Sequence, residues 1–339
     1  MTLHKIINTE FETIGSATCD ELASPSCGRM AFRSRDKEGF LDLESNIVIE
    51  AQYEGVTDFW RESGLSKVMC KREGHHIYGL IDISGRVVLE PRFRDMSDPH
   101  EGLIAVLNSN SDNLRGYMTV TGQVVIPPTF RTAEKFSCGL APAATPSDWE
   151  NDELYFIDHA GKKALGPFQH GTDYVKASFR DDGITCVVDC CIGKRVLTDT
   201  RGRVVATGWG NFKINDYAGG IVEVYEEINE STFRVGYTNV NGDFIVPPQC
   251  DEPGVFTGDY ILAKINGFWT LYDIRGRQIT DMQFDNSDDV TLPTCAILVF
   301  AETQKNGDKK WRYLNLVTGK LSPLYETAQP FSEGFAVVT

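Results

Sequence analysis

An aspartate recurs along this chain, in most copies three residues before the glycine of a tight turn, and repeated carboxylates are groups that could exchange protons with a substrate. The series is Asp42, Asp82, Asp158, Asp199 and Asp273, with Thr119, Asn239 and Asn315 at the same place in other copies. Threonine and asparagine cannot act as general acids or bases, whereas all three residue types can accept hydrogen bonds from turn amides. We therefore predict a structural cap on each turn and no catalytic residue at this position.

The other residues with metal-binding or nucleophilic chemistry do not form a recognisable site. The six histidines make no ligand pair at strand or helix spacing, and the adjacent His75 and His76 would point to opposite faces of a strand. The acidic stretch 285–289, DNSDD, lacks the glycine and the final glutamate of a calcium-binding loop. Phosphate-binding loops, nucleophile elbows and zinc-protease motifs do not occur. We expect no enzyme activity, no metal site and no cofactor.

Two polar loops are rich in carboxylates, and one of them also carries a tryptophan, a combination suited to gripping a basic partner. They read TPSDWENDE at 145–153 and YEEINESTF at 225–233. Another tryptophan, at 60, follows a phenylalanine that aligns with core positions, which leaves the tryptophan outside the core pattern. The alternative is a solvated acidic loop with its tryptophan packed on a sheet. The candidate partner-binding residues are Trp60, Trp149, Glu150, Asp152, Glu153, Glu226, Glu227 and Glu230.

The elements that position these loops are copies of one short unit. The stretch 78–93, YGLIDISGRVVLEPRF, returns at 115–130 as RGYMTVTGQVVIPPTF, and the turn glycines Gly85 and Gly122 are 37 residues apart (122 − 85). A tight hairpin needs a residue at positive φ, which glycine adopts most easily. β-Branched residues around the turn and prolines at the strand end predict strands. Further copies occur at 38–53, 153–168, 194–209, 235–250, 269–284 and 311–326.

Each copy also has a second half, clearest in FSCGLAPAA (136–144) and FSEGFAVVT (331–339). A unit of three short strands cannot bury its own faces, so neighbouring units must stack. We predict an all-β fold of about eight repeats, each of about 40 residues, in an open curved β-array or solenoid, with a β-propeller as the alternative. Both chain ends match second halves, so residues 1–38 are expected to form an N-terminal half-repeat or cap. Residues 39–339 are expected to form a single domain of tandem repeats.

This pattern resembles the bacterial WG (KWG) repeat family, with an aromatic-glycine strand, a turn with glycine and a basic residue, a VVIPP strand and an F-S-x-G-L-A segment. The resemblance covers roughly residues 11–339, and the chain is similar to a divergent member of that family. The glycine of the Trp-Gly pair remains at Gly39, Gly79, Gly116 and Gly236, and the tryptophan remains at Trp269 and Trp311. The resemblance implies a β-rich module with a binding or scaffolding role and no known catalysis.

Charge and composition restrict the kind of partner. Lys and Arg number 33 against 48 Asp and Glu, for a net charge of −15, so nucleic acid and anionic membranes would be repelled while a basic protein would be attracted. Residues 1–15 lack the features of a signal peptide, and the chain has no apolar run of about 20 residues. Nine scattered cysteines fit a reducing compartment. We expect a cytoplasmic protein.

These observations predict a non-enzymatic protein-protein interaction scaffold, an acidic protein that binds and masks a basic protein. Immunity to a delivered bacterial toxin is one role that fits. The alternatives are a carbohydrate- or cell-wall-binding repeat protein and a propeller-type enzyme. Only two of the five tryptophans, Trp269 and Trp311, recur at one repeat phase, which disfavours a regular sugar-stacking surface. The sequence does not indicate an oligomeric state.

Overall fold

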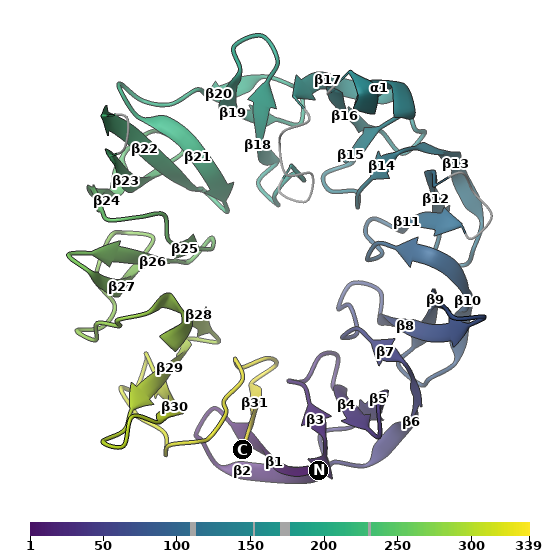
Figure 1. The fold of residues 1–339 in the computed structure, drawn as a ribbon, viewed down its shortest axis with the longest axis vertical. Helices are drawn as coiled ribbons and strands as arrows, with labels where there is room; N and C mark the ends of the chain where they lie inside the picture. The colour runs from purple at the N-terminus through teal and green to yellow at the C-terminus, as the bar shows by residue number, and fades with distance from the viewer. Residues whose placement is uncertain (109–112, 152, 170–176, 230–231) are drawn as a thin grey trace. The chain divides into compact units, whose positions relative to one another are not determined.

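The computed structural model of the chain describes residues 1–108, 113–151, 153–169, 177–229 and 232–339. They form small antiparallel sheets in which strands that follow one another in the chain are mostly neighbours (Figure 1). The chain divides into two compact parts, the terminal part (Met1–Asp98 with Ser287–Thr339) and the central part (Pro99–Asn286). The predicted all-β repeat fold is confirmed, and its many small sheets fit both the predicted array and the propeller alternative.

In the terminal part, one sheet joins the two ends of the chain and consists of β2 (Thr13–Cys19), β1 (Thr2–Asn8) and β31 (Phe335–Val338). The next contains β3 (Glu21–Leu22), β4 (Met30–Ser34), β5 (Lys37–Leu41) and β6 (Ile47–Tyr53). Neighbouring strands follow as β7 (Gly55–Val56), β8 (Leu65–Arg72), β9 (His75–Asp82) and β10 (Val87–Met96). A further sheet contains β28 (Val290–Thr294), β29 (Ile297–Thr303) and β30 (Lys309–Asn315), preceded by the 3-10 turn η1 (Ser287–Asp289).

The central part begins with the neighbouring strands β11 (Leu103–Asn108), β12 (Arg115–Thr119) and β13 (Val124–Phe130). A longer sheet contains β14 (Thr132–Ala133), β15 (Ala141–Ala144), β16 (Glu153–Ile157), β17 (Lys163–Gln169), β18 (Ile184–Asp189), β19 (Lys194–Asp199) and β20 (Val204–Ala206), with α1 (Pro146–Glu150) before β16. The remaining sheets are β21 (Lys213–Ala218), β22 (Ile221–Asn229), β23 (Thr232–Asn239) and β24 (Phe244–Cys250), then β25 (Val255–Phe256), β26 (Tyr260–Ile265) and β27 (Phe268–Asp273).

The recurring polar residue before each turn glycine is a cap, as predicted. One carboxylate oxygen of Asp82 accepts hydrogen bonds from the backbone amides of Ser84 and Arg86, both at 3.0 Å. Asn239 makes the same pair of bonds, at 2.9 and 3.0 Å, to the amides two and four residues further on. Turn amides also donate to the side chains of Asp42, Thr119, Asp158, Asp199, Asp273 and Asn315. One side chain therefore holds each hairpin from within.

Four copies have a glycine in the strand before the turn, and the closeness of the neighbouring strand requires it there. A Cβ atom at Gly79 would lie 2.5 Å from the carbonyl oxygen of Leu89, and one at Gly116 would lie 2.5 Å from that of Ile126. The pairing register of each hairpin shifts here, as in a β-bulge. A side chain at this position would push the two backbones apart.

The turn glycine of one repeat packs against the repeat before it. Gly85 has a φ of +87°, and a Cβ there would lie 3.1 Å from Cγ1 of Ile49. Gly242 has a φ of +90°, and a Cβ there would collide with the indole ring of Trp209. Glycine therefore serves both the turn and the joint between consecutive repeats.

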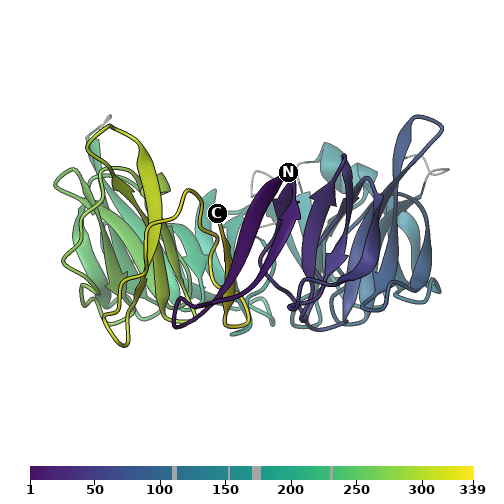
Figure 2. The same cartoon turned by 90° about the horizontal axis from the view of Figure 1, so that it is seen from below.

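The two ends of the chain are hydrogen-bonded to each other. β1 pairs antiparallel with β31, from Lys5 opposite Val338 to Asn8 opposite Phe335 (Figure 2). The ring of Phe11 stacks on that of Tyr313 at 5.8 Å between centroids. Residues 2–19 thus complete the last repeat, while β3 and β4 open the first. The predicted N-terminal cap, residues 1–38, contains both of these pieces.

Glu333 fastens the join between the chain ends. Its two carboxylate oxygens accept hydrogen bonds from the backbone amides of Cys27 at 2.8 Å and Gly28 at 2.9 Å. In the central part, both carboxylate oxygens of Glu101 accept from the one amide of Gly139, at 3.0 and 3.1 Å. A glutamate at the tip of one repeat can therefore bind the turn amides of the next repeat.

The long polar loops lie at one phase of the repeat, but they join neighbouring strands of a single sheet. The loop 108–115 lies between β11 and β12, 145–153 between β15 and β16, 225–233 between β22 and β23, and 302–310 between β29 and β30. They therefore lie within a sheet and do not connect one sheet to the next. Strand order along the chain does not by itself tell which consecutive strands share hydrogen bonds.

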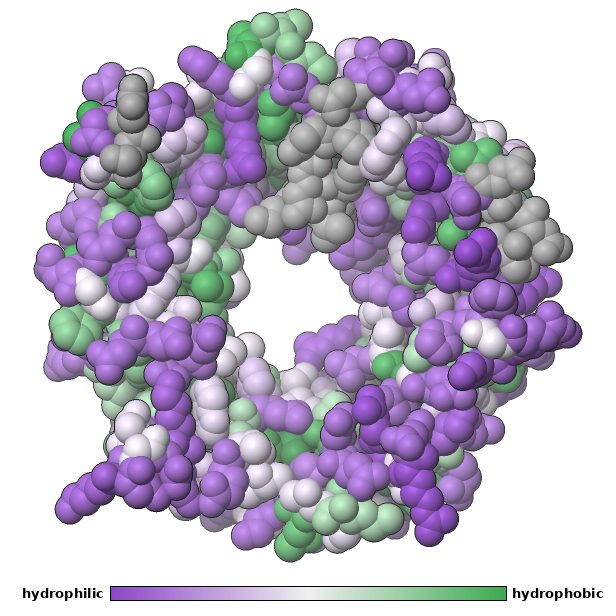
Figure 3. All heavy atoms as spheres, viewed as in Figure 1, coloured by the Kyte–Doolittle hydropathy of each residue, from purple (hydrophilic) through white to green (hydrophobic). Residues whose placement is uncertain are grey.

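Residues at equivalent positions of different repeats are buried in the core. The phenylalanines that align in the second half of three copies, Phe59, Phe136 and Phe331, are all fully buried, as expected for residues that pack between neighbouring strands. On the face drawn in Figure 3, hydrophilic residues cover most of the surface of each part. Candidate functional residues are therefore sought in the loops and in the hollows of the surface.

Candidate functional site

The central part carries a short helix, α1, where the sequence indicated only a loop. The side-chain oxygen of Thr145 accepts a hydrogen bond from the amide of Asp148 at 3.3 Å, and the Asp148 carboxylate accepts one from the amide of Thr145 at 3.0 Å. This capping box begins directly before Pro146, a residue well suited to a first helical turn. The Thr-Pro-x-Asp spacing was the signal in the sequence that could have revealed the helix.

Asp148 ties α1 to its sheet. Its carboxylate is buried and lies 2.6 Å from Nζ of Lys163 in β17. Burial alone would raise the pKa of Asp148, but the hydrogen bonds from Lys163 and Thr145 outweigh burial and hold that pKa below its ordinary value. The same Lys163 ammonium lies 3.6 Å from the ring centre of Tyr155. The helix is therefore anchored through an ionised side chain on its inner face.

The outer side of α1 presents an aromatic and an acidic side chain. Trp149 is 40% exposed and Glu150 is exposed. The guanidinium of Arg131 lies 5.9 Å from the centre of the Trp149 ring, within the range of a cation–π contact. Glu153, just beyond the helix, is half-buried and accepts a hydrogen bond from the hydroxyl of Tyr155 at 3.1 Å. Trp149 and Glu150 thus form an accessible pair on a rigid support.

The second acidic cluster is partly engaged within its own sheet. Glu226 accepts a hydrogen bond from the side-chain amide of Asn211 at 3.2 Å, and Glu227 lies 2.7 Å from Nζ of Lys213. In Figure 1, β17–β20 lie between α1 and the β22–β23 hairpin that carries these residues. The structure therefore does not bring the two acidic clusters into one site.

The remaining candidate residues do not extend the surface formed by these clusters. Asp152 and Glu230 lie outside the described residues. Trp60 belongs to the terminal part, is half-buried, and its amide donates to the carbonyl oxygen of Leu65 at 2.8 Å. The candidate surface thus reduces to Trp149 and Glu150, with Glu153 beside them and Glu226 and Glu227 on another hairpin.

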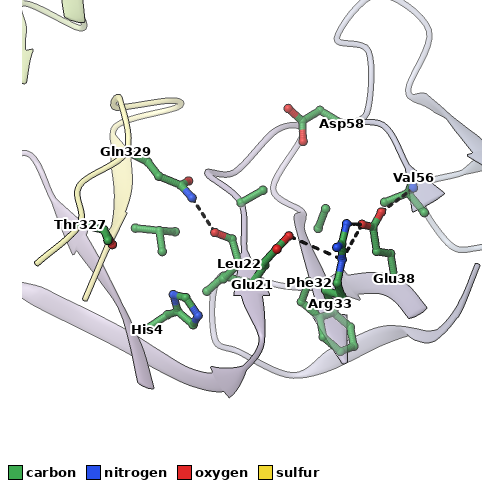
Figure 4. A pocket seen from close by; sticks show the side chains of 13 residues that line it. His4, Glu21, Leu22, Phe32, Arg33, Glu38, Val56, Asp58, Thr327 and Gln329 are labelled. Atoms are coloured by element: carbon green, nitrogen blue, oxygen red, sulfur yellow. Dashed lines mark hydrogen bonds and ion pairs between the residues drawn. The ribbon is translucent and has the colours of Figure 1, made fainter. Parts of the chain in front are cut away.

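The terminal part contains a hollow that the sequence analysis did not anticipate. It has a volume of about 450 Å³ and is lined by residues of β1, β3, β4, β5, β7 and β31 and by the segment before β31 (Figure 4). Its wall combines apolar side chains such as Leu22, Phe32 and Val337 with a histidine, an arginine and three carboxylates. A partly apolar hollow with a few polar groups is the usual form of a small-ligand site.

One wall of the hollow is an ion-pair network. Nη2 of Arg33 lies 2.6 Å from Oε1 of Glu38, and the other oxygen of Glu38 accepts a hydrogen bond from the amide of Val56 at 2.7 Å. Glu21 lies 3.5 Å from Nε of Arg33. Glu38 is therefore fully engaged, whereas Glu21 is loosely held and 67% exposed.

Two polar groups of the hollow lack partners within the described part of the chain. His4 is only 9% exposed, and its Nε2 atom is buried without a hydrogen-bond partner. The carboxylate of Asp58 makes no hydrogen bond or ion pair to a described residue. It reaches solvent on one side, yet partial burial raises its pKa. The alternation that buries His4 with Ile6 in β1 could have revealed the histidine, whereas Asp58 has no such signal.

The described residues include no group of three or more His, Cys, Asp and Glu side chains arranged to hold a metal ion. None of the helices in the described ranges is long and apolar enough to cross a membrane.

One solved structure shares the fold of this chain. A crystal structure titled as the eukaryotic initiation factor aligns with 99% of this chain and 98% of its own, at 12% identity and a TM-score of 0.61. The WD40 domain of Toxoplasma gondii coronin aligns with 81% of this chain and 78% of its own, at 12% identity and a TM-score of 0.34. At such identity the first likeness concerns the fold alone.

Comparison with known sequences identifies the repeat. No curated protein matches the chain. The family described as WG containing repeat matches residues 39–71, 78–110, 116–144, 236–269 and 320–339. Four of these stretches contain or begin with one of the close-packed strand glycines at 39, 79, 116 and 236. The chain is therefore a β-protein that contains WG-type repeats, as its sequence resemblance predicted.

Proposed function

We propose that this repeat-containing β-protein is a non-enzymatic scaffold that binds a basic protein. The repeated polar residues have a structural role, because their side chains accept hydrogen bonds from the amides of their own turns. Loops carried on such a frame vary from repeat to repeat and are the natural place for recognition.

The feature that supports this proposal most directly is α1. Its capping box and buried Asp148 fix the helix, and the helix holds Trp149 and Glu150 toward solvent. Arg131 already lies beside the Trp149 ring, so this ring accepts a guanidinium within the chain itself. A basic partner would add a further cation to the ring and a hydrogen bond to Glu150.

The net charge of −15 supports the same kind of partner. A field of this sign attracts a basic protein over a distance set by the ionic strength and raises the association rate. Masking of a basic toxin in the cytoplasm, as by an immunity protein, is the biological role that we propose for such binding. The nine cysteines, all of which lie in the described ranges, form no disulfide bond there, which is compatible with that compartment.

The test uses a fluorescein-labelled peptide of alternating arginine and glycine as the basic probe, with binding followed by anisotropy. We expect binding at low salt that weakens toward about 0.5 M NaCl, because the attraction is screened. Trp149→Ala should weaken binding about tenfold, and the double variant Glu150→Gln/Glu153→Gln should weaken it by a similar factor.

The matched control is the double variant Glu44→Gln/Glu73→Gln, which makes the same charge change at exposed positions of the terminal part. It should bind the peptide nearly as well as the wild type. Absence of binding at low salt, or equal loss in the two double variants, would remove α1 from the proposal. Capture of a basic protein from the source organism by the wild type, and its loss in Trp149→Ala, would then identify the natural partner.

A further inference from the structure

The hollow in the terminal part is chemically unlike the acidic loops and lies in different sheets. Residues from both ends of the chain form it, including His4 in β1, Glu21 in β3 and Gln329 just before β31. Gln329 is held there because its side-chain amide donates to the carbonyl oxygen of Leu22 at 2.7 Å (Figure 4). The join between the chain ends thus shapes the hollow.

The charges in the wall of the hollow do not balance. Among the described residues that line it, Arg33 is the one guanidinium, against three carboxylates, those of Glu21, Glu38 and Asp58. Arg33 binds Glu38 at 2.6 Å, which neutralises that pair. Glu21 is at 3.5 Å from Arg33, and Asp58 has no ionic partner among the described residues. The free charge facing the hollow is therefore negative and favours a cation.

The hollow also contains a buried polar atom without a partner. Nε2 of His4 makes no hydrogen bond in the described structure, although only 9% of the residue is exposed. Leaving such an atom unpaired is destabilising, because it has lost its hydrogen bond to water and gained none from the protein. In Figure 4 the His4 ring lies among the lining side chains, between Thr327 and Glu21. A ligand with hydrogen-bond donors could pair with this ring after a small shift of the side chain.

The remaining wall is apolar and suits a hydrocarbon body. Leu22, Phe32, Val56 and Val337 contribute to it. A volume of about 450 Å³ lies within the usual range of small-ligand sites. Metal ions are a poor fit, because no group of three ligating side chains occurs among the described residues.

From these features we infer that the hollow binds an organic cation with a short apolar body, an alkylguanidinium or alkylammonium group. The cation would lie between the Asp58 and Glu21 carboxylates, and its carbon chain would lie against Leu22 and Phe32, beside the His4 ring. Such a group occurs as a free amine or guanidine and as the side chain of arginine or lysine. The inference is independent of the α1 surface and of the proposed basic-protein partner.

The experiment compares N-butylguanidinium with N-butylurea, which has nearly the same shape and no charge. Binding is measured by calorimetry and by the ring-nitrogen signals of protein labelled with ¹⁵N-histidine. We expect saturable binding of N-butylguanidinium that shifts the His4 signals, and at least about tenfold weaker binding of the urea. Equal binding of the two compounds, or no shift of the His4 signals at millimolar ligand, would overturn the inference.

Asp58→Asn is the informative variant, because this exposed carboxylate has no partner in the described part of the chain whose loss would destabilise the fold. It should weaken N-butylguanidinium binding about tenfold and leave the thermal unfolding midpoint close to that of the wild type. Glu50→Gln, which removes one exposed charge outside the lining, is the control and should bind normally. Unchanged binding in Asp58→Asn would overturn the assignment.

A second arm identifies the source of the cation. The peptide acetyl-Ala-Ala-Arg-Ala-Ala-amide is titrated in the same way, beside its citrulline counterpart. Binding of the arginine peptide with loss in Asp58→Asn indicates a partner's side chain, whereas binding of N-butylguanidinium alone indicates a free small molecule. Failure of both ligands would remove the hollow as a cation site and leave the test of α1 unaffected.

Discussion

At the scale of single residues, the chain uses one polar side chain to hold each hairpin, and the chemistry of that side chain is interchangeable. Asp82 and Asn239 accept the same two turn amides at nearly the same distances. Aspartate adds an ion pair to the basic residue four positions on, as between Asp82 and Arg86 at 2.9 Å. The amide contacts are common to the series, and the ion pair is an addition in some repeats.

We predict that Asp82→Ala lowers the free energy of unfolding by about 1 kcal/mol, because two turn amides lose their acceptor. Asp82→Asn should cost less, since the side-chain oxygen remains, as in Asn239. Urea unfolding followed by circular dichroism measures both. Equal losses in the two variants would show that the charge, and not the acceptor, stabilises the turn.

The difference in unfolding free energy between the wild type and Asp82→Asn should depend on pH. The Ser84 hydroxyl, followed by Arg86 and the turn amides, lowers the pKa of Asp82 from 3.8 to about 2. Because the folded-state pKa lies below the unfolded-state value, this stabilisation is complete above pH 3.8 and is lost as the pH falls toward about 2. The stability difference between the wild type and Asp82→Asn should therefore shrink over that interval. A difference that stays constant there would contradict the ionic contribution.

At the scale of elements, consecutive repeats are joined where a turn glycine meets the repeat before it. The sequence predicts these hairpins well, because a glycine at positive φ and a cap three or four residues earlier act locally. It did not show that the glycine also faces a side chain about one repeat away, such as Trp209 for Gly242. Helix α1 was missed for another reason: its capping box is local, but the stretch is too short for a helical pattern of apolar residues.

Gly242→Ala and Gly307→Ala distinguish the two roles of a turn glycine, which are to adopt a positive φ and to leave room for the preceding repeat. Both residues have a φ of +90°, but a Cβ would collide with Trp209 at the first and meet nothing within 4 Å at the second. We expect Gly307→Ala to cost about 1 kcal/mol for the backbone and Gly242→Ala more than about 2 kcal/mol. Chemical unfolding of both variants is the measurement. Similar losses would mean that the joint adapts to a methyl group without cost.

At the scale of the whole molecule, the features that sequence analysis could not provide depend on residues far apart in the chain. Cys27 and Glu333 are hydrogen-bonded although 306 positions separate them. The repeat pattern shows where strands occur, but the pairing of β1 with β31 and the hollow beside it exist only after the ends have met. For the same reason the sequence did not indicate that His4 and Asp58 line one hollow. It did indicate that Trp149 and Glu150 lie together, because they are adjacent in the chain.

Removal of residues 327–339 should expose the first strands. The truncated chain lacks β31 and Glu333, so the amides of β1 from Lys5 to Asn8 lose the strand that they pair with. We expect a lower unfolding temperature and faster hydrogen exchange in residues 2–19. Glu333→Gln, which keeps β31, should retain most of the protection. Unchanged exchange in the truncated chain would show that the β1–β2 hairpin is stable without its partner.

The pairing of β1 with β31 also has a consequence for biosynthesis. Lys5 lies opposite Val338, so 333 further residues (338 − 5) must be synthesised after Lys5 before its partner residue exists. Throughout that interval one edge of β1 is open, and an open edge is a template for pairing with another chain. In a polysome, the β31 of one nascent copy could occupy the β1 of its neighbour and exchange the chain ends between them. β1 therefore gains its second neighbouring strand only after β31 has been synthesised.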